Sequence, residues 1–499
     1  MPEPLRIGNC SGFYGDRLSA MREQLEGGEL DVLTGDYLAE LTMLILGKDT
    51  MKDPSWGYAR TFVTQVEDCL GLTLEKGVRI VSNAGGLNPA GLADRLREVA
   101  RGLGLDPAIA HVEGDDLRPL GRWEDALTAN AYLGGFGIAA ALRAGADVVV
   151  TGRVTDASLV VGPAVAHHGW DPTSYDALAG AVVAGHVIEC GTQATGGNFS
   201  GFLGLPGRDR PLGFPVAEVA ADGSSVITKH EGTGGAVTVD TVTAQLVYEI
   251  QSTRYLGPDV TVLLDTVSLD QRGSDRVAIS GVRGEVPPER LKVCLNELGG
   301  WRNSAELVLT GLDLDAKEAW VRDQLETAWG DRRPETVAWS RSAAPEPDAG
   351  AMDRAYSLLR CTVLDPDPKI AGKGLTGPLV ELALGSYPGF TLTAPPSPAT
   401  PYGVYRPEYV ERAAVTHAVV HADGRREVVG DPPVSTLPAG TDSDASARRT
   451  SYQDRHNPAR DIASSGERPA DPGLCLFDYD HARLLPLGTF VHARSGDKG

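Results

Sequence analysis

The N-terminal part of the chain repeats one local pattern, and this pattern limits the folds that are open to it. A short aliphatic run is followed by a small polar loop and then by an amphipathic helical stretch. The aliphatic runs lie at residues 5–8, 30–33, 78–81, 109–112 and 147–150. Continuous apolar strands that alternate with helices are typical of a parallel sheet covered by helices on both faces. The sequence therefore predicts a doubly wound, mostly parallel α/β ligand-binding domain over residues 1–208.

The pattern changes beyond residue 208. The segments 238–250, 259–269 and 276–285 are rich in β-branched residues, which are enriched in strands. A strand-like segment at 305–311 then leads into a helical pattern over 313–329. Strands that pair locally and are joined by a few helices predict a second domain of the α+β class over residues 209–430.

The C-terminal region has a different composition. Residues 431–472 contain few apolar residues and many Ser, Pro, Asp and Arg, so they cannot bury a core. We expect this stretch to be a flexible, disordered linker. Residues 473–499 begin like a strand, and we expect them to be the start of a truncated small C-terminal domain.

Charge and cysteine content narrow the class of protein. The formal net charge is −21, whereas nucleic-acid binders usually carry a basic patch or a basic domain. The chain has no apolar run of about 18 residues that would span a membrane, and its N-terminus lacks the features of a secretory signal. The six cysteines form no CxxC pair, which is typical of reduced thiols. We expect a cytoplasmic homo-oligomer with neither nucleic acid nor membrane as a partner.

The polar loops are candidate ligand contacts, because ligands of doubly wound sheets bind outside the carboxyl ends of the strands. Glycine accounts for 60 of the 499 residues, well above the usual share of about 7%, and it lets a backbone approach a ligand closely. Asn88 before Pro89 is typical of a helix start, where amides and the helix dipole attract anions. The candidate contacts to an anionic small-molecule substrate are Ser11, Gly12, Asn83, Gly85, Gly86, Asn88, Thr151, Gly152 and Arg153.

The same loops have a purely structural explanation. Gly after a strand and Asn before a helix are ordinary turn residues that need no ligand. The dinucleotide fingerprint GxGxxG and the phosphate-binding motif GxxxxGK[ST] are both absent from the sequence, which argues against nicotinamide chemistry and nucleotide hydrolysis.

Acidic residues follow several of the predicted strands. Asp36, Asp115, Asp116 and Asp156 come after three different strands, and we expect them to approach one pocket. Carboxyl groups that lie close together raise one another's pKa, which suits acid–base catalysis, or they bind Mg²⁺. Asp36 and Glu40 are also spaced i and i+4, on one helical face. The alternative is helix capping, a role in which Asp is common.

Residues 185–198 hold the densest group of reactive side chains. On a helix, His186, Glu189 and Cys190 share a face, so that His and Glu would form an acid–base pair, or His and Cys a thiolate nucleophile. The loop 194–198 resembles an anion cradle of backbone amides, and the turn 231–235 would close over the same ligand. The alternative is a buried Cys and a hydrogen-bonded core His, and the spacing matches no zinc signature.

These patterns define two candidate sets. The candidate catalytic residues are Asp36, Asp156, His186, Glu189 and Cys190. The further candidate ligand contacts are Gly196, Gly197, Asn198 and Thr233.

Several motifs, taken in order, closely resemble the acyclic terpene utilisation protein AtuA family. They are RIGNCSGFYGDR, LTGDYLAELTM, VSNAGGLNP, VVTGRVTDASL, GHVIECGTQATGGNFSGF and EGTGG. The resemblance covers most of residues 5–430, and the ending PLGTFVHARSGDKG resembles the opening of the family's small C-terminal domain. It implies a role in the breakdown of acyclic terpenoids or related branched acids as acyl-CoA thioesters. It implies no catalytic residue, so the candidates above rest on the residue patterns alone.

The residues and the resemblance together favour an enzyme that acts on a branched acyl-CoA or its hydroxy acid. Acid–base chemistry would make it a hydratase or a carbon–carbon lyase, with CoA entering as part of the substrate. One alternative is a non-catalytic subunit or scaffold of the same pathway. Another is a divalent-metal hydrolase that uses the Asp cluster.

Overall fold

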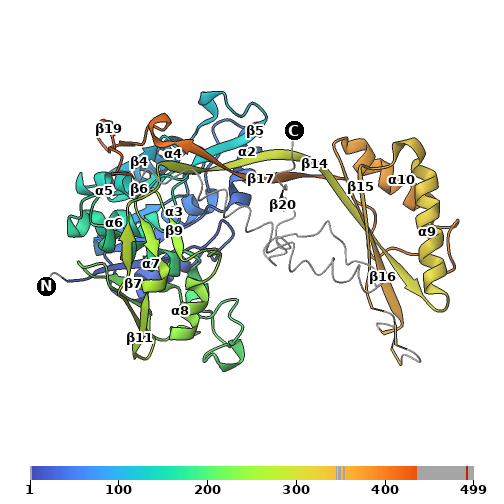
Figure 1. Cartoon of the computed structure of the whole chain (residues 1–499), viewed down its shortest axis with the longest axis horizontal. Coiled ribbons are helices and arrows are strands. Elements are labelled where there is room, and N and C mark those ends of the chain that lie inside the picture. The colour runs from blue at the N-terminus through green and yellow to red at the C-terminus, as the bar shows by residue number, and fades with distance from the viewer. Residues whose placement is uncertain (1–2, 344, 347–349, 352–353, 435–489, 493–499) are drawn as a thin grey trace. The chain divides into compact units, whose positions relative to one another are not determined.

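The computed structural model describes residues 3–343, 345–346, 350–351, 354–434 and 490–492 (Figure 1). The chain divides into two compact units. Among the described residues, unit 1 comprises 3–295 and 407–434, and unit 2 comprises 296–343, 345–346, 350–351, 354–406 and 490–492. The boundary that we expected at residues 208/209 therefore falls inside unit 1.

The centre of unit 1 is a parallel sheet, as the repeated strand–loop–helix pattern predicts. Its strands pair in parallel in the spatial order β1-β2-β3-β6-β4. Their bounds are Leu5–Asn9 (β1), Val32–Gly35 (β2), Arg79–Ser82 (β3), Val148–Thr151 (β6) and Ile109–Glu113 (β4). Because these strands run in one direction, the loops that follow them leave from one edge of the sheet.

Helices cover both faces of this sheet, which confirms the predicted α/β class. Successive strand residues point to opposite faces. Val148 and Val150 therefore pack in one core with α1, α3 and α4, whereas Val149 packs in the other core with α5, α6 and α7. The bounds of these helices are Ala20–Gly27 (α1), Arg60–Lys76 (α3), Pro89–Leu103 (α4), Phe136–Arg143 (α5), Ser158–His168 (α6) and Tyr175–Glu189 (α7).

Antiparallel strands extend the same sheet at both ends, so the complete sheet is mixed. The order β11-β12-β8-β7 continues from β1, and β18 and β19 continue from β4. Their bounds are Pro215–Val219 (β7), Ser225–Lys229 (β8), Ser268–Gly273 (β11), Arg276–Ser280 (β12), Ala418–Val420 (β18) and Arg426–Val428 (β19). The strands beyond residue 208 do pair locally, as expected, but they join the N-terminal sheet.

One predicted strand is wrong. Residues 239–246 lie in a β-rich segment but form the helix α8 (Val239–Leu246). A capping box starts this helix, because Thr238 Oγ1 accepts a hydrogen bond from Thr241 N at 3.1 Å while Thr238 N donates to Thr241 Oγ1 at 3.0 Å. This reciprocal cap satisfies two backbone groups and outweighs the β preference of the following side chains.

Four shorter strands and one helix complete unit 1. Strands β13, β10 and β9 form a three-stranded antiparallel sheet, and β5 pairs with β14 (Arg290–Thr310). The bounds are Glu40–Lys52 (α2), Ala126–Ala131 (β5), Arg254–Leu256 (β9), Thr261–Leu263 (β10) and Arg283–Glu285 (β13).

Unit 2 is built on an antiparallel sheet with helices packed against it. The long strand β14 (Arg290–Thr310) starts in unit 1 and pairs with β16 (Tyr356–Asp365), which pairs in turn with β15 (Thr336–Arg341). Leu325 and Trp329 of α9 (Leu314–Trp329) are buried in the core of this unit, which confirms the helix predicted over 313–329. The remaining bounds are Leu375–Glu381 (α10), Thr400–Glu411 (β17) and Phe490–His492 (β20).

The C-terminal expectations fall largely outside the described residues. Only 431–434 of the expected linker and 490–492 of the expected small domain are described. Among the described helices, none is both long enough and apolar enough to cross a membrane.

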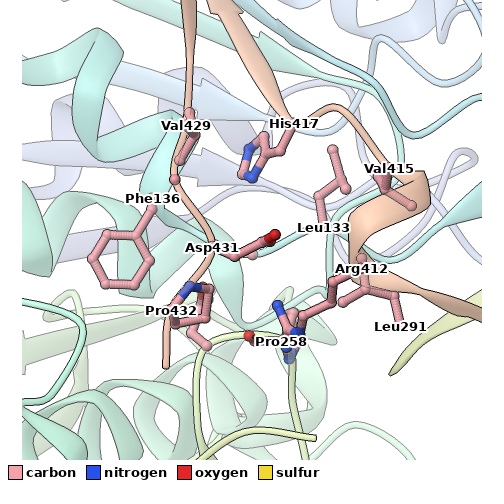
Figure 2. Close-up of a pocket in the computed structure, with 13 residues that line it drawn as sticks. Leu133, Phe136, Pro258, Leu291, Arg412, Val415, His417, Val429, Asp431 and Pro432 are labelled. Atoms are coloured by element: carbon pink, nitrogen blue, oxygen red, sulfur yellow. Dashed lines mark hydrogen bonds between the residues drawn. The ribbon is translucent and has the colours of Figure 1, made fainter. Parts of the chain in front are cut away.

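Unit 1 contains a small cavity of about 20 Å³. Its lining includes Phe136 at the start of α5 and residues from the segments 412–417 and 429–432. Figure 2 shows the His417 ring and the Asp431 carboxyl pointing into it. Arg412 Nε donates to the Pro288 carbonyl at 2.9 Å, and Asp259 Oδ2 accepts from Gly135 N at 2.8 Å. Burial lowers the pKa of His417 to about 4 and raises that of Asp259 to about 6. A cavity of this size holds about one water molecule.

The partly buried His417 predicts a loss of stability in acid. Its pKa in the folded state is below the ordinary 6.5, so the unfolded chain takes up the proton first and stability is lost as pH falls from 6.5 toward 4. Between pH 7 and pH 5 the free energy of unfolding should fall by about 2 kcal/mol more in the natural protein than in His417→Gln. Urea unfolding at both pH values measures this, with the exposed His167→Gln as control. Equal pH dependence in His417→Gln and the natural protein would contradict the assignment.

Candidate functional site

Two of the predicted site residues meet where β2 and β3 end. Asp36 follows β2 and Asn83 follows β3, and both side chains are buried. Asn83 Nδ2 donates to Asp36 Oδ1 at 2.6 Å, and Asn83 Oδ1 accepts from Tyr37 N at 2.8 Å. The Asn83 amide therefore holds the Asp36 carboxyl at the edge of the sheet.

Arg153 follows β6 and lies beside these residues. Its guanidinium contacts several groups of the same chain. Its side chain is only 2% exposed. Its Nη1 donates to the Leu38 carbonyl and lies 3.0 Å from Asp156 Oδ1. Its guanidinium lies over the Tyr132 ring, 4.3 Å from the centroid. Its Nε is buried without a hydrogen-bond partner, so one donor remains for another group.

The last turn of α7 brings His186 and Glu189 to the same edge. Asn9, the last residue of β1, donates from Nδ2 to the carbonyls of Ile188 at 2.7 Å and Glu189 at 3.0 Å. His186 Nδ1 lies 2.9 Å from Glu189 Oε1, as the i, i+3 spacing on a helix permits. Both side chains are at least nine-tenths buried, yet His186 Nε2 and Glu189 Oε2 have no hydrogen-bond partner.

The carboxyl groups at this edge lie close enough to act on one another. Burial, followed by repulsion from Asp156, raises the pKa of Asp36 and of Glu189 well above the usual range. Burial also lowers the pKa of His186. Burial therefore shifts both members of the Glu189–His186 pair toward their uncharged forms, because a buried site disfavours the charged form of each group.

Three further residues lie near Asp156, namely Glu40, which is partly exposed, Tyr132, which is buried, and Lys292, which is exposed. The Asp156 side chain is 30% exposed. Tyr132 Oη donates to Glu40 Oε1 at 2.7 Å, and Lys292 Nζ lies 4.9 Å from the centroid of the Tyr132 ring. Burial alone would raise the pKa of Glu40, but Arg153, Lys292 and the Tyr132 hydroxyl outweigh it and lower that pKa. Glu40 therefore stays ionised.

Sequence reasoning missed Tyr132 and Lys292. Tyr132 N donates to the Lys292 carbonyl at 2.9 Å, next to the pairing of β5 with β14. This pairing joins residues far apart in the chain, so no local pattern marks it. The expectation that Asp36 and Glu40 share a helical face is wrong, because α2 begins at Glu40 and Asp36 lies in the loop before it.

Several glycines of the loops lie against the protein itself. A Cβ atom on Gly12 would lie 2.7 Å from the backbone carbon of Cys190, and one on Gly152 would lie 2.3 Å from Asp115 Oδ1. A Cβ on Gly85 would lie 2.4 Å from the Thr151 carbonyl oxygen. These glycines permit close packing of the loops that carry the site. Gly86, with φ of 54°, is likewise crowded by Leu46.

Other residues predicted to contact a ligand make hydrogen bonds to the protein itself. Asn88 caps α4 by accepting from Gly91 N at 2.9 Å. Ser11 Oγ donates to the Phe13 carbonyl at 3.0 Å, and Thr151 Oγ1 donates to the Gly152 carbonyl at 2.8 Å. These bonds are the turn and cap chemistry that we weighed as the alternative, and the role of these residues in ligand binding stays a prediction.

The two glycine-rich turns contact each other. Ala236 N donates to the Thr195 carbonyl at 2.9 Å. Asn198 Nδ2 donates to Gln193 Oε1 at 3.0 Å, and Thr233 Oγ1 donates to the His230 carbonyl at 2.8 Å. Within the described residues, no hydrogen bond or ion pair joins these turns to the carboxyl groups above. A ligand role for Gly196, Gly197, Asn198 and Thr233 therefore stays a prediction as well.

Cys190 lies beside the acidic cluster, and its surroundings oppose a thiolate. Burial and the nearby Glu189 raise the pKa of its thiol well above the ordinary value. The His186 ring pairs with Glu189. Nucleophilic catalysis needs the ionised sulfur, which this environment disfavours. In the described part of the chain, no three His, Cys, Asp or Glu side chains are grouped so as to hold a metal ion.

The close packing of Gly12 predicts a large cost for the smallest added side chain. The extra methyl of Gly12→Ala would collide with the Cys190 backbone and should lower the free energy of unfolding by about 1–3 kcal/mol. Gly102→Ala is the control, because a Cβ there meets nothing within 4 Å and alanine favours the helix by about 1 kcal/mol. Chemical unfolding measures both. A Gly12→Ala protein as stable as the natural one would contradict the packing.

Comparisons with known proteins identify the family. No curated protein and no solved structure matches the chain. One family model matches residues 5–421, which span every residue of the site described above, and its description is "Acyclic terpene utilisation family protein AtuA". The match covers well over half of the chain and agrees with the motifs at the strand ends. The protein belongs to the acyclic terpene utilisation AtuA family.

Proposed function

We propose that the protein is an enzyme that hydrates or cleaves a branched acyl-CoA, or the corresponding hydroxy acid, by acid–base chemistry. The observation that carries this proposal is the buried Glu189–His186 pair, which lies within electrostatic range of Asp156. Membership of a family named for acyclic terpene utilisation supports the branched substrate.

Both reactions need an acid and a base at one centre. In hydration, a base takes a proton from water as its oxygen bonds to carbon, and an acid protonates the neighbouring carbon. In lysis, a base takes the hydroxyl proton, the carbon–carbon bond breaks, and an acid protonates the departing carbon. Groups with pKa values shifted toward neutrality perform such transfers well.

The cluster offers a group for each step. Glu189, protonated because of its burial, is the proposed acid, and His186 shares its proton through the 2.9 Å contact. Asp156 is partly exposed and its pKa is raised, first by burial, so it is the proposed base. The unpaired Arg153 Nε would donate to a thioester oxygen that gains negative charge during the reaction.

The proposal predicts that Glu189→Gln abolishes most activity without unfolding the protein. Glutamine has the shape of a protonated glutamic acid and carries no proton that it can transfer. We expect turnover to fall by about 10²–10⁴-fold, with a melting temperature close to the natural one. Product formation from branched unsaturated acyl-CoA and 3-hydroxyacyl-CoA thioesters, followed by mass spectrometry, measures this. The exposed Glu98→Gln on α4 is the control, and full activity in Glu189→Gln would refute the assigned role.

A ligand screen tests the substrate class itself. A compound that binds only the folded protein raises its melting temperature. We expect a rise with branched acyl-CoA thioesters or their acids, and none with CoA-free straight-chain alcohols. If no thioester or acid gives either a thermal shift or turnover, the proposed function is wrong.

A further inference from the structure

Asp115 lies just beyond the end of β4, and its carboxyl contacts the loop that carries Arg153. The residue is only 3% exposed. Its Oδ2 accepts hydrogen bonds from Arg153 N at 2.8 Å and from Asn130 Nδ2 at 2.7 Å. Asn130 lies on β5 and is itself fully buried. One carboxyl oxygen therefore joins the loop after β6 to the end of β4 and to β5.

Both backbone polar groups of Arg153 are held in place. Asp115 accepts from its N–H, and its carbonyl accepts from Leu133 N at 3.2 Å. A Cβ atom on Gly152, the residue before Arg153, would lie 2.3 Å from Asp115 Oδ1. Glycine at this position therefore allows the loop to approach the carboxyl closely enough for the bond to Arg153 N.

The Asp115 carboxyl is mainly ionised at neutral pH although it is buried. Burial raises its pKa to about 6, while the hydrogen bonds from Arg153 N and Asn130 act against this increase. N–H groups that donate to a carboxylate form shorter and stronger bonds than those that donate to a neutral acceptor. The next acidic residue, Asp116, pairs instead with Arg118, with Oδ2 2.8 Å from Nη2.

The position of the Arg153 backbone determines where its side chain can donate. The guanidinium lies against Asp156 and over the Tyr132 ring. Nε, the guanidinium nitrogen nearest to the backbone, is buried without a partner and is the proposed donor to the substrate. A displacement of about 1 Å in an active site can cost about 10²-fold in rate, so the bonds that fix this backbone bear directly on the donor.

We propose that Asp115 is a positioning residue, which fixes the Arg153 backbone so that Nε reaches the substrate oxygen. Asp115 acts through Arg153 and has no contact with the substrate. This inference rests on the proposed function. It gives a buried acid at this edge of the sheet a role other than proton transfer.

A double-mutant cycle in kcat/KM separates this role from a general loss of structure. Arg153→Lys keeps a positive charge but has no Nε donor, and it should lower kcat/KM for a branched acyl-CoA by about 10²–10³-fold. Asp115→Ala removes the acceptor for Arg153 N and should lower kcat/KM by about 10²-fold. Because Asp115 acts through Arg153, the double variant should lie within about threefold of Arg153→Lys alone. Losses that multiply in the double variant would overturn the inference.

Two further variants control for stability. Asp115→Asn keeps an oxygen that can accept from Arg153 N, so it should recover most of the rate that Asp115→Ala loses. Asp147→Ala is the matched control at the other end of β6, because Asp147 Oδ2 accepts from a backbone N–H, that of Ala108, at 2.8 Å. It should lower the melting temperature and leave kcat/KM unchanged. Equal losses of kcat/KM in Asp147→Ala and Asp115→Ala would overturn the positioning role.

Crystal structures of the variants test the inference without a substrate. In Asp115→Ala the Arg153 Nε should move by about 1 Å or more, whereas in Asp115→Asn and Asp147→Ala it should keep its position. If Asp115→Ala does not fold, Asp115→Ser takes its place, because its side chain is polar but too short to bond Arg153 N.

The two kinds of failure are distinguishable. An Arg153 side chain that keeps its position in Asp115→Ala, or in Asp115→Ser, would overturn the positioning role alone. Absence of turnover with every thioester and acid would overturn the proposed function, and the displacement of Arg153 would still decide whether Asp115 fixes it.

Discussion

The two hydrogen bonds from Asn9 to the last turn of α7 fix the relation between the helix and the parallel sheet. Asn9 ends β1, and its amide holds the carbonyls of Ile188 and Glu189. The loops after β2, β3 and β6 leave the same edge of the sheet. Glu189 is thereby brought within range of Asp36 and Asp156, and the character of the whole cluster follows from this placement.

Burial then sets the protonation of the cluster. Taking a carboxyl group out of water favours its neutral form, and neighbouring carboxyl groups add to the effect. The pKa of Glu189 is therefore raised while that of His186 is lowered. Glu40 is an exception, since Arg153, Lys292 and Tyr132 keep it ionised. Buried acids whose pKa values are raised in this way are suited to proton transfer, which is the chemistry that we propose.

Much of this arrangement could be predicted from the sequence, because it follows from one rule. Parallel strands expose their carboxyl ends at one edge, so Asp36, Asn83 and Arg153 could be assigned to one place from their positions after apolar runs. The helical spacing of His186 and Glu189 likewise predicted their contact. The role of the glycines was harder to predict. A sequence does not show whether a glycine makes room for a ligand or, as at Gly12, for the protein's own backbone at Cys190.

The missed residues depend on contacts that are distant in the chain. Lys292 and Tyr132 meet through the pairing of β5 with β14. The helix α8 was missed because its segment is rich in β-branched residues. The capping box at Thr238 and Thr241 was the local signal for that helix. The antiparallel strands at both ends of the N-terminal sheet were missed for the same reason. Pairing at the ends of a sheet joins segments that are far apart in the chain, so no single segment predicts it.

The proposed chemistry depends on Glu189 holding its proton at neutral pH. Infrared difference spectroscopy of the natural protein against Glu189→Gln measures this directly, since the carbonyl stretch of a carboxylic acid is separate from the bands of a carboxylate. We expect a carboxylic acid band at neutral pH that disappears in Glu189→Gln. A difference spectrum with carboxylate bands alone would contradict it.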